Sequence, residues 1–230
     1  MITSAANPRL KLVRKLASAR QRRKLGLFAV EGEDLVEAGL AAGLEPVDLL
    51  RAREDVAPEL LPSVSGLAHP PRVVAVFRTA DLPHPDPSNR LLLGLALWRV
   101  SDPGNVGTLI RTADAFGAFV ALSAGCADPT SPKALRASAG AVFRVPAGRF
   151  DEAPGRRIAL VAHGGRPLAE IELGDGVCFV LGTERDGLPG DLLAGCDEAA
   201  TILLAEGAES LNVAVAGAIA LYEARRRGEG

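Results

Sequence analysis

The sequence has few cysteines, few aromatic residues and no long apolar run. Its 3 cysteines, Cys126, Cys178 and Cys196, are odd in number and lack C-x-x-C spacing, which argues against a disulfide framework or a zinc site. Aromatic residues make up 4% of the chain, which argues against a base-stacking platform for single-stranded nucleic acid. No stretch approaches about 18 consecutive apolar residues, and no apolar block follows the basic N-terminus. We therefore expect a cytoplasmic protein that neither spans a membrane nor needs a metal.

The net charge is only -2, but the charge is distributed unevenly along the chain. Residues 1–30 hold eight basic side chains and no acidic one, so the rest of the chain carries an excess of acidic residues. Leu10, Val13 and Leu16 recur there at helical spacing, so the basic side chains cover the remaining surface of a helix. That surface is a solvated face, an RNA contact or a membrane-surface helix, and the lack of bulky aromatics argues against the membrane. The eight residues are Arg9, Lys11, Arg14, Lys15, Arg20, Arg22, Arg23 and Lys24.

A proline-rich segment, DLPHPDPSN at 81–89, divides the 230 residues. It has no apolar periodicity, so it predicts a linker between one domain at 1–80 and another at 90–230. Hydropathy patterns before the linker predict helices at 8–25, 33–42 and near 54–61, and strands at 27–31, 46–51 and 72–77. Patterns after the linker predict strands at 91–98, 118–123, 141–145, 157–162, 176–182 and 200–204, and helices within 102–118 and at 131–139, 189–194 and 210–227.

Several predicted strands, such as LLLGLAL, IALVA and VCFVL, are continuous apolar runs. Such runs are typical of a parallel sheet that helices cover on both faces, so the predicted class is α/β. In an open parallel sheet, ligands bind beyond the carboxyl ends of the strands. Polar residues that directly follow these strands are therefore candidate site residues.

The segment DPGNVGTLIRTADAFGA at 102–118 follows one such strand. Val106 and Leu109 belong to an apolar stripe at helical spacing, which predicts a packed helix. Asn105 stands near the N-cap position, and Arg111 projects almost opposite the stripe. The core needs neither residue. Taken alone, the pair would be a cap and a solvated arginine, so other segments must decide whether they have a function.

Two further segments lie at equivalent positions. In LGTERDGLPG, at 181–190, Glu184 follows an apolar strand and is flanked by glycines that permit a sharp turn. In LLAEGAESLNVAVAGAIALYE, at 203–223, Ser210 is a candidate cap for a helix that is apolar on all sides and must be buried on more than one. Asn212 lies within that helix. A buried asparagine needs hydrogen-bond partners, from a neighbouring loop or from another subunit.

These three segments resemble, in order and spacing, the signature motifs of the SpoU, or TrmH, family of RNA ribose 2'-O-methyltransferases. The resemblance covers 90–227, and SPKALRASAGAVFRVP at 131–146 adds a weaker match. The segment RQRRKLGLFAVEGEDLVEAGLAAG is similar to the substrate-binding domain, of ribosomal protein L30e type, of members that act on ribosomal RNA. The sequence departs from the family at two positions: Leu203, where the family often has Pro, and Ala214, where the family often has Ser. Both departures bear on the geometry of the cofactor loop.

The resemblance implies a SPOUT fold, with a parallel sheet and a C-terminal trefoil knot, preceded by a small L30e-like α/β domain. It also implies a homodimer that packs through the knotted region. The cofactor would be S-adenosyl-L-methionine. Its expected contacts are Leu181, Gly182, Ile202, Leu204, Ser210 and Leu211.

The resemblance also implies roles for the polar residues. Arg111 would activate the ribose hydroxyl with an RNA phosphate nearby, although an arginine hardly deprotonates, so we expect its role to be partly electrostatic. Asn105 would hold Arg111 or the ribose, while Glu184, Ser210 and Asn212 would shape the knot and position the substrate. The enzyme must align the ribose oxygen with the electrophilic methyl group and help the proton leave, and no metal is required.

The expected substrate is structured RNA, with ribosomal RNA favoured over transfer RNA. Three alternatives remain open at this stage: a transfer-RNA methyltransferase, a noncatalytic RNA-binding or ribosome-assembly protein of the same fold, and a small-molecule enzyme that uses the same crevice. The basic N-terminal segment argues against the last of these. The expected RNA contacts are Arg9, Lys11, Arg14, Arg22, Arg23 and Lys24.

Overall fold

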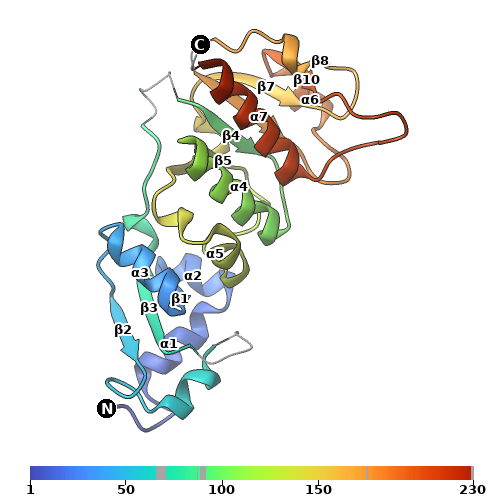
Figure 1. Cartoon of the computed structure of the whole chain (residues 1–230). Helices are drawn as coiled ribbons and strands as arrows, with labels where there is room; N and C mark the ends of the chain where they lie inside the picture. Colours follow the sequence, from blue (N-terminus) through green and yellow to red (C-terminus); the bar gives the residue numbers. More distant parts are fainter. Residues whose placement is uncertain (66–70, 87, 89–91, 175, 229–230) are drawn as a thin grey trace.

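The computed structural model describes residues 1–65, 71–86, 88, 92–174 and 176–228, and within them the chain forms two sheets (Figure 1). The first sheet has three antiparallel strands in the order β1-β3-β2. Its elements are α1 (Pro8–Leu16), α2 (Ala19–Leu25), β1 (Leu27–Glu31), α3 (Glu33–Ala41), β2 (Asp48–Arg51), the 3-10 helix Pro58–Ser63, β3 (Val73–Arg78) and the 3-10 helix Thr79–Asp81.

The second sheet has seven parallel strands in the order β6-β5-β4-β9-β7-β10-β8, as predicted for an α/β protein. Its strands are β4 (Gly94–Leu97), β5 (Phe119–Leu122), β6 (Ala147–Arg149), β7 (Arg156–Leu160), β8 (Arg166–Pro167), β9 (Val177–Leu181) and β10 (Glu198–Thr201). Its helices are α4 (Pro103–Phe116), α5 (Pro132–Ser138), α6 (Gly190–Ala194) and α7 (Val213–Gly228), with 3-10 turns at Ala141–Phe143, Phe150–Glu152 and Leu168–Glu170.

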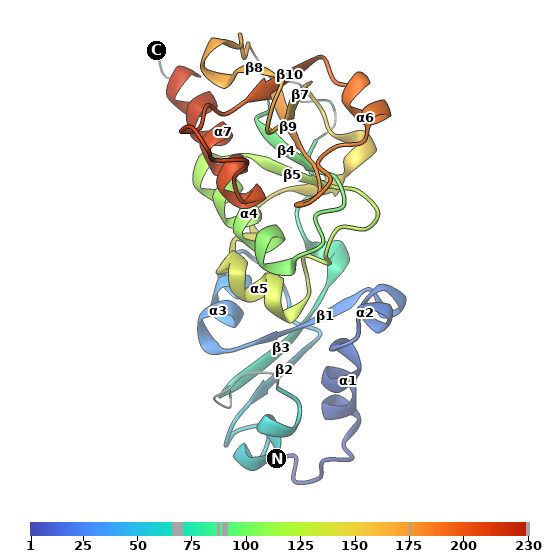
Figure 2. The same cartoon turned by 90° about the vertical axis from the view of Figure 1, so that its right-hand side faces the viewer.

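Helices α4 and α7 lie side by side over one face of this sheet (Figures 1 and 2). Their close approach depends on Gly217, because a Cβ atom there would lie 2.5 Å from the Leu109 side chain of α4. The two helices run in the same direction, so both begin near the carboxyl ends of the strands. Polar residues of the two N-terminal turns can therefore meet.

Three predicted elements differ from the structure. The helix expected at 8–25 is divided at Ala17 and Ser18, and the Arg22 guanidinium accounts for the break because it binds the carbonyl groups of Leu16 and Ala17. The helix expected near 54–61 is a 3-10 helix with a proline inside it, which removes a backbone donor. The strand expected at 141–145 is wrong and is discussed next.

Residues Ala141–Phe143 form a 3-10 turn, and the strand follows later, as β6. Ala139 and Gly140 before it adopt left-handed backbone angles, with φ of 48° and 85°, which end α5 and redirect the chain. Phe143 then packs against Phe28 and Phe77 of the three-stranded sheet, with ring centroids 6.4 and 5.9 Å away. Packing between the two parts of the molecule therefore outweighs the local strand pattern.

Candidate active site

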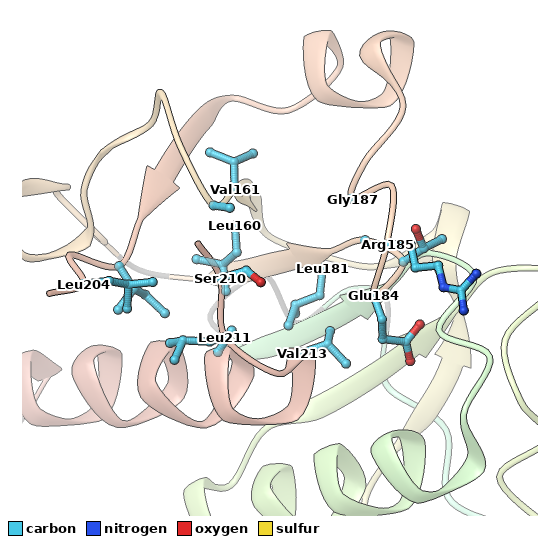
Figure 3. A pocket seen from close by; sticks show the side chains of 15 residues that line it. Leu160, Val161, Leu181, Glu184, Arg185, Gly187, Leu204, Ser210, Leu211 and Val213 are labelled. Carbon is cyan, nitrogen blue, oxygen red and sulfur yellow. The ribbon is translucent and has the colours of Figure 1, made fainter. Parts of the chain in front are cut away.

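A cavity lies at the carboxyl ends of β7, β9 and β10 (Figure 3). Leu160 and Leu181 end two of these strands, and Ile202 follows the third. The cavity has a volume of about 180 Å³ and is partly open to solvent. Its lining residues are Leu160, Val161, Ala162, Leu181, Gly182, Thr183, Glu184, Arg185, Gly187, Ile202, Leu204, Ser210, Leu211, Val213 and Ala216.

The loop after β9 forms one wall of this cavity. Thr183 and Gly187 exchange two backbone hydrogen bonds, of 2.9 and 3.2 Å, so the turn of three residues between them is tight. Gly182 permits this turn, because a Cβ atom there would lie 2.2 Å from the backbone of Gly187. The turn projects the side chains of Glu184 and Arg185 to one side of the cavity (Figure 3).

Asn105 connects the three polar segments. Its Nδ2 donates a hydrogen bond of 3.0 Å to Glu184 Oε1, and its Oδ1 accepts one of 3.2 Å from Asn212 Nδ2. These residues come from α4, the loop after β9 and the residue before α7, and they lie up to 107 positions apart in the sequence. The hydrogen-bonded chain thus holds two helix starts and the cavity loop together.

Both predicted helix caps are wrong. The residue that caps α4 is Asp102, whose carboxylate accepts from the Asn105 backbone at 3.0 Å, so Asn105 lies in the first turn with its side chain free to reach Glu184. Asn212, not Ser210, caps α7, since its Oδ1 accepts from the backbone of Ala214 at 2.9 Å. Asn212 is also exposed in the single chain rather than buried.

The carboxylate of Asp102 belongs to a second polar contact at this edge. Lys133 Nζ, from the start of α5, donates to it at 2.7 Å. This hydrogen bond, together with those from the backbone of Asn105 and Gly104, holds the pKa of Asp102 below its ordinary value. The first turns of α4 and α5 are therefore joined.

The family model for the SpoU rRNA methylase family matches residues 93–222, which contain the cavity and all three polar segments. The chain belongs to the SpoU rRNA methylase family. A second family model, the MRM3-like substrate binding domain, matches residues 7–79.

Known relatives of this SpoU-family chain match it over nearly its whole length. The 23S rRNA (guanosine(2553)-2'-O)-methyltransferase RlmP of Bacillus subtilis is 33% identical over 97% of this chain and 98% of its own. The SpoU methyltransferase AviRb of Streptomyces viridochromogenes, solved in complex with AdoMet, has a TM-score of 0.86 and 28% identity over 97% of this chain and 99% of that chain. An AdoMet-bound rRNA methyltransferase of Sinorhizobium meliloti has a TM-score of 0.86 and 32% identity over 98% of this chain and 97% of that chain.

The SpoU-family motifs are not all gathered at the cavity. The cavity lining includes all six residues that the resemblance assigned to the cofactor, together with Glu184. Asn105 is hydrogen-bonded to Glu184, and Asn212 is hydrogen-bonded to Asn105. Arg111 is exposed on α4 and is not among the lining residues. It forms no hydrogen bond or ion pair with any residue that the structure describes. Its guanidinium is therefore available to a ligand or to another chain.

Sequence reasoning missed several residues of the cavity in this SpoU-family chain. Leu160, Val161 and Ala162 end and follow β7, and they carry no polar group that would attract attention. The available signal was topological, because every parallel strand of the sheet ends at the same edge. The other lining residues that were not predicted are Thr183, Arg185, Gly187, Val213 and Ala216.

The predicted RNA-contact residues divide into three groups. Lys11, Arg23 and Lys24 are exposed and have no side-chain partner within the described residues. Arg9 binds Asp48, which raises the pKa of that arginine, and Arg14 donates to carbonyl groups and to a serine hydroxyl. These side chains are held in place, and Arg9 remains 42% exposed.

Arg22, the third group, was predicted wrongly as an RNA contact. It is buried, with 4% of its surface exposed, and it donates two hydrogen bonds to Asp128 Oδ2, at 2.8 and 2.6 Å. Its other donors bind the carbonyl groups of Leu16 and Ala17. A guanidinium used in this way is not available to an RNA phosphate, so we remove Arg22 from the expected contacts.

The described part of the chain contains no helix with the length and apolar character needed to cross a membrane. It also contains no group of three or more His, Cys, Asp and Glu side chains arranged to hold a metal ion.

Proposed function

We propose that this chain methylates a ribose 2'-hydroxyl of ribosomal RNA, with Arg111 acting on the reacting sugar. The enzyme class follows from the family: the chain is an S-adenosylmethionine-dependent RNA ribose 2'-O-methyltransferase of the SPOUT fold. The observation that carries the proposal is the cavity at the carboxyl ends of β7, β9 and β10, together with the hydrogen-bonded chain beside it.

The cavity fits S-adenosylmethionine by its chemistry. Aliphatic side chains such as Leu160, Leu181 and Leu211 offer apolar walls to an adenosine, and three strand ends offer backbone groups for hydrogen bonds. Gly182 lets the two sides of the loop after β9 lie so close together that a side chain at position 182 would push the Gly187 backbone away. When bound, this cofactor supplies an electrophilic methyl group. The residues proposed to hold it are Leu181, Gly182, Ile202, Leu204, Ser210 and Leu211.

The chain's own polar residues would then orient the substrate. Asn105 is fixed by Glu184 and Asn212, so its position beside the cavity is set before RNA binds. A guanidinium is a cation with five N–H donors, so we propose that Arg111 stabilises the oxyanion that develops as the ribose hydroxyl loses its proton. Ser210 lines the cavity and is exposed, which suits a contact to cofactor or ribose.

The proposed active form is a homodimer. Helix α7 was expected to be buried on more than one side, yet Val215 and Tyr222 are 46% and 56% exposed in the single chain. Leu211, just before the helix, is 36% exposed. A second copy packed against these residues would bury them and would complete the surroundings of Asn212, and the trefoil knot expected of this region stays a prediction.

Ribosomal RNA is the favoured substrate for two reasons. RlmP, a 23S rRNA methyltransferase, matches 97% of this chain, whereas a solved protein linked to 2'-OH methylation of tRNA position 34 covers 60% of it. Residues 7–79 match a substrate-binding domain, and the exposed Lys11, Arg23 and Lys24 suit contacts to phosphates. We propose a substrate domain at 1–80, a linker at 81–89 and a methyltransferase domain at 90–230. The proposed compartment is the cytoplasm, in keeping with free Cys126, Cys178 and Cys196.

The test is incubation of the purified chain with methyl-labelled S-adenosylmethionine and, separately, ribosomal RNA and transfer RNA that lack modifications. We expect label in ribosomal RNA at a ribose 2'-oxygen, and at least a hundredfold less label with Arg111→Ala. Because Arg111 has no partner among the described residues, the melting temperature of the Arg111→Ala variant should equal that of the wild type. RNA binding without transfer would favour a noncatalytic assembly protein, and label in transfer RNA alone would favour the tRNA alternative.

A further inference from the structure

A second, larger cavity lies where the two parts of the molecule meet. It has a volume of about 720 Å³ and is partly open to solvent, and we call it the Arg22–Asp128 cleft. One wall comes from α2 and the end of β3, and the other comes from the ends of β5 and β6. Its lining residues are Arg22, Arg23, Gly26, Thr79, Leu82, His84, Pro85, Leu122, Asp128, Pro129, Thr130, Ala147, Gly148, Arg149 and Glu152.

The cleft is preformed because Arg22 joins its two walls. Two Arg22 donors bind one oxygen of Asp128, a contact between residues 106 positions apart, and only 5% of the Arg22 side chain is exposed. The second oxygen of Asp128 accepts from the backbone and hydroxyl of Thr130, at 2.8 and 2.6 Å, which fixes the opposite wall. A buried charge pair with its hydrogen bonds filled is costly to break, so the walls keep their spacing. A ligand would therefore find the site already formed.

The chemistry of the lining suits a nucleotide. Leu82, Pro85, Leu122 and Pro129 are apolar side chains that a base could lie against. At the rim, Arg23 is exposed and has no side-chain partner within the described residues, and its planar guanidinium can bind a phosphate or stack on a base.

The remaining charges of the lining are paired. Arg149 meets Glu152 at 3.5 Å, but both side chains are well exposed, so this pair is weak and can exchange for a phosphate. With Arg22 neutralised by Asp128, the uncompensated charge of the cleft is the positive charge of Arg23.

The sheet order places the cleft and the methyl-donor cavity on one edge. The cleft includes the ends of β5 and β6, and the cavity includes the ends of β9, β7 and β10, with β4 between β5 and β9. Since neighbouring strands are about 4.8 Å apart, the end of β5 is on the order of 10 Å from that of β9. The exposed Arg99 follows β4, which lies between β5 and β9 in the sheet. A few nucleotides of RNA can span the distance.

We propose that the Arg22–Asp128 cleft binds an unpaired nucleotide of the RNA substrate, close in sequence to the nucleotide that is methylated. The inference rests on the proposed function, because it takes RNA as the substrate. It assigns Arg23 and Arg149 as phosphate contacts. Arg22 becomes a positioning residue that sets the spacing between the substrate domain and the methyl-donor cavity.

The first experiment measures binding of a fluorescein-labelled single-stranded RNA of mixed sequence by anisotropy, over a range of salt concentrations. We expect Arg23→Ala and Arg149→Ala each to weaken binding about five-fold or more. Each should also lower the slope of log affinity against log salt by about 0.7, the value for one lost phosphate contact in single-stranded RNA. The matched control is Arg72→Ala, an exposed arginine of the substrate domain that does not line the cleft. Equal effects of all three substitutions would overturn the proposal.

The second experiment uses the unaltered chain. RNA that carries 4-thiouridine is cross-linked by light, and the attached peptides are identified by mass spectrometry. Cross-links within residues 122–130 or 147–149 support the proposal, and cross-links confined to α1 overturn it. If Arg23→Ala and Arg149→Ala methylate ribosomal RNA like the wild type while Arg111→Ala does not, the cleft proposal fails and the proposed function stands. If the wild type transfers no label, the proposed function fails.

Discussion

Asn105 Nδ2 donates a hydrogen bond of 3.0 Å to Glu184 Oε1, and the same amide accepts one from Asn212. One side chain in the first turn of α4 thereby connects the loop after β9 with the start of α7. The loop and the helix start both line the cavity proposed for the methyl donor. The asparagine can do this because Asp102, three residues earlier, takes over the capping of α4.

This arrangement predicts a specific defect for Asn105→Asp. The substitution removes the donor and sets a carboxylate against that of Glu184, so the loop is repelled rather than held. A hydrogen bond to a charged group is worth about 1.5–3 kcal/mol when buried, and the exposure of this one reduces it to about 1 kcal/mol, or about a five-fold loss in methylation rate. The rate is measured with labelled cofactor at saturating RNA. Thr108→Val, on the exposed side of the same helix, is the control, and equal rates for Asn105→Asp and wild type would contradict the role.

Gly182→Ala tests the tight turn of the cavity loop. The new Cβ atom would lie 2.2 Å from the Gly187 backbone, so the loop must move, and we expect cofactor affinity to fall at least ten-fold. Calorimetric titration with S-adenosylmethionine measures this. Gly190→Ala is the matched control, since its Cβ atom meets nothing within 4 Å. Unchanged affinity in Gly182→Ala would show that the loop does not contact the cofactor.

The sequence was informative about the sheet because its strands are continuous apolar runs, and a parallel sheet then places all its ligands at one edge. For that reason, polar residues that follow β4 and β9, such as Asn105 and Glu184, could be predicted at one edge of the sheet. Leu181 and Leu204 were assigned to the cofactor only through the resemblance to the SpoU family. Val161 and Ala162 were missed because an apolar residue after a strand looks the same whether it lines a cavity or packs in the core.

Arg22 shows a limit of a different kind. Within residues 20–24 it is one of four basic side chains, and no local pattern separates it from Arg23. What distinguishes them is Asp128, which approaches only after the two sheets have come together. The caps were also predicted wrongly. Asp102 and Asn105 are both good capping residues, as are Ser210 and Asn212, so residue type alone does not decide which one accepts the backbone hydrogen bond at the helix start.

Glu223 near the end of α7 predicts a pH-dependent contribution to stability. Hydrogen bonds from Arg226 and Arg227 lower its pKa from 4.5 to about 2. A carboxyl group whose pKa is lower in the folded state stabilises that state above the unfolded pKa, and the contribution is lost as the pH falls from 4.5 towards 2. We therefore expect Glu223→Gln to lower the melting temperature at pH 7.

The difference between this variant and the wild type should shrink below pH 4.5 and disappear only below about pH 2, as followed by thermal circular dichroism. Glu209→Gln is the control, because Glu209 is exposed and has no partner among the described residues. A difference that stays constant over the whole pH range would mean that packing, not ionisation, is responsible.

The exposed side of α7 provides the last prediction. Val215 is 46% exposed in the single chain, and it lies in the part of the helix, residues 213–221, that consists of apolar residues and one glycine. If a second copy covers this side, Val215→Glu introduces a charge into the contact and should convert a dimer into a monomer in light scattering. Its circular dichroism spectrum should not change, because the side chain packs against little within its own chain. Leu40→Glu makes the same change at a 40% exposed position of α3 and should remain dimeric. A wild-type chain that is monomeric at micromolar concentration, or a Val215→Glu variant that stays dimeric, would exclude this face as the contact, and the site would then have to be complete within one chain.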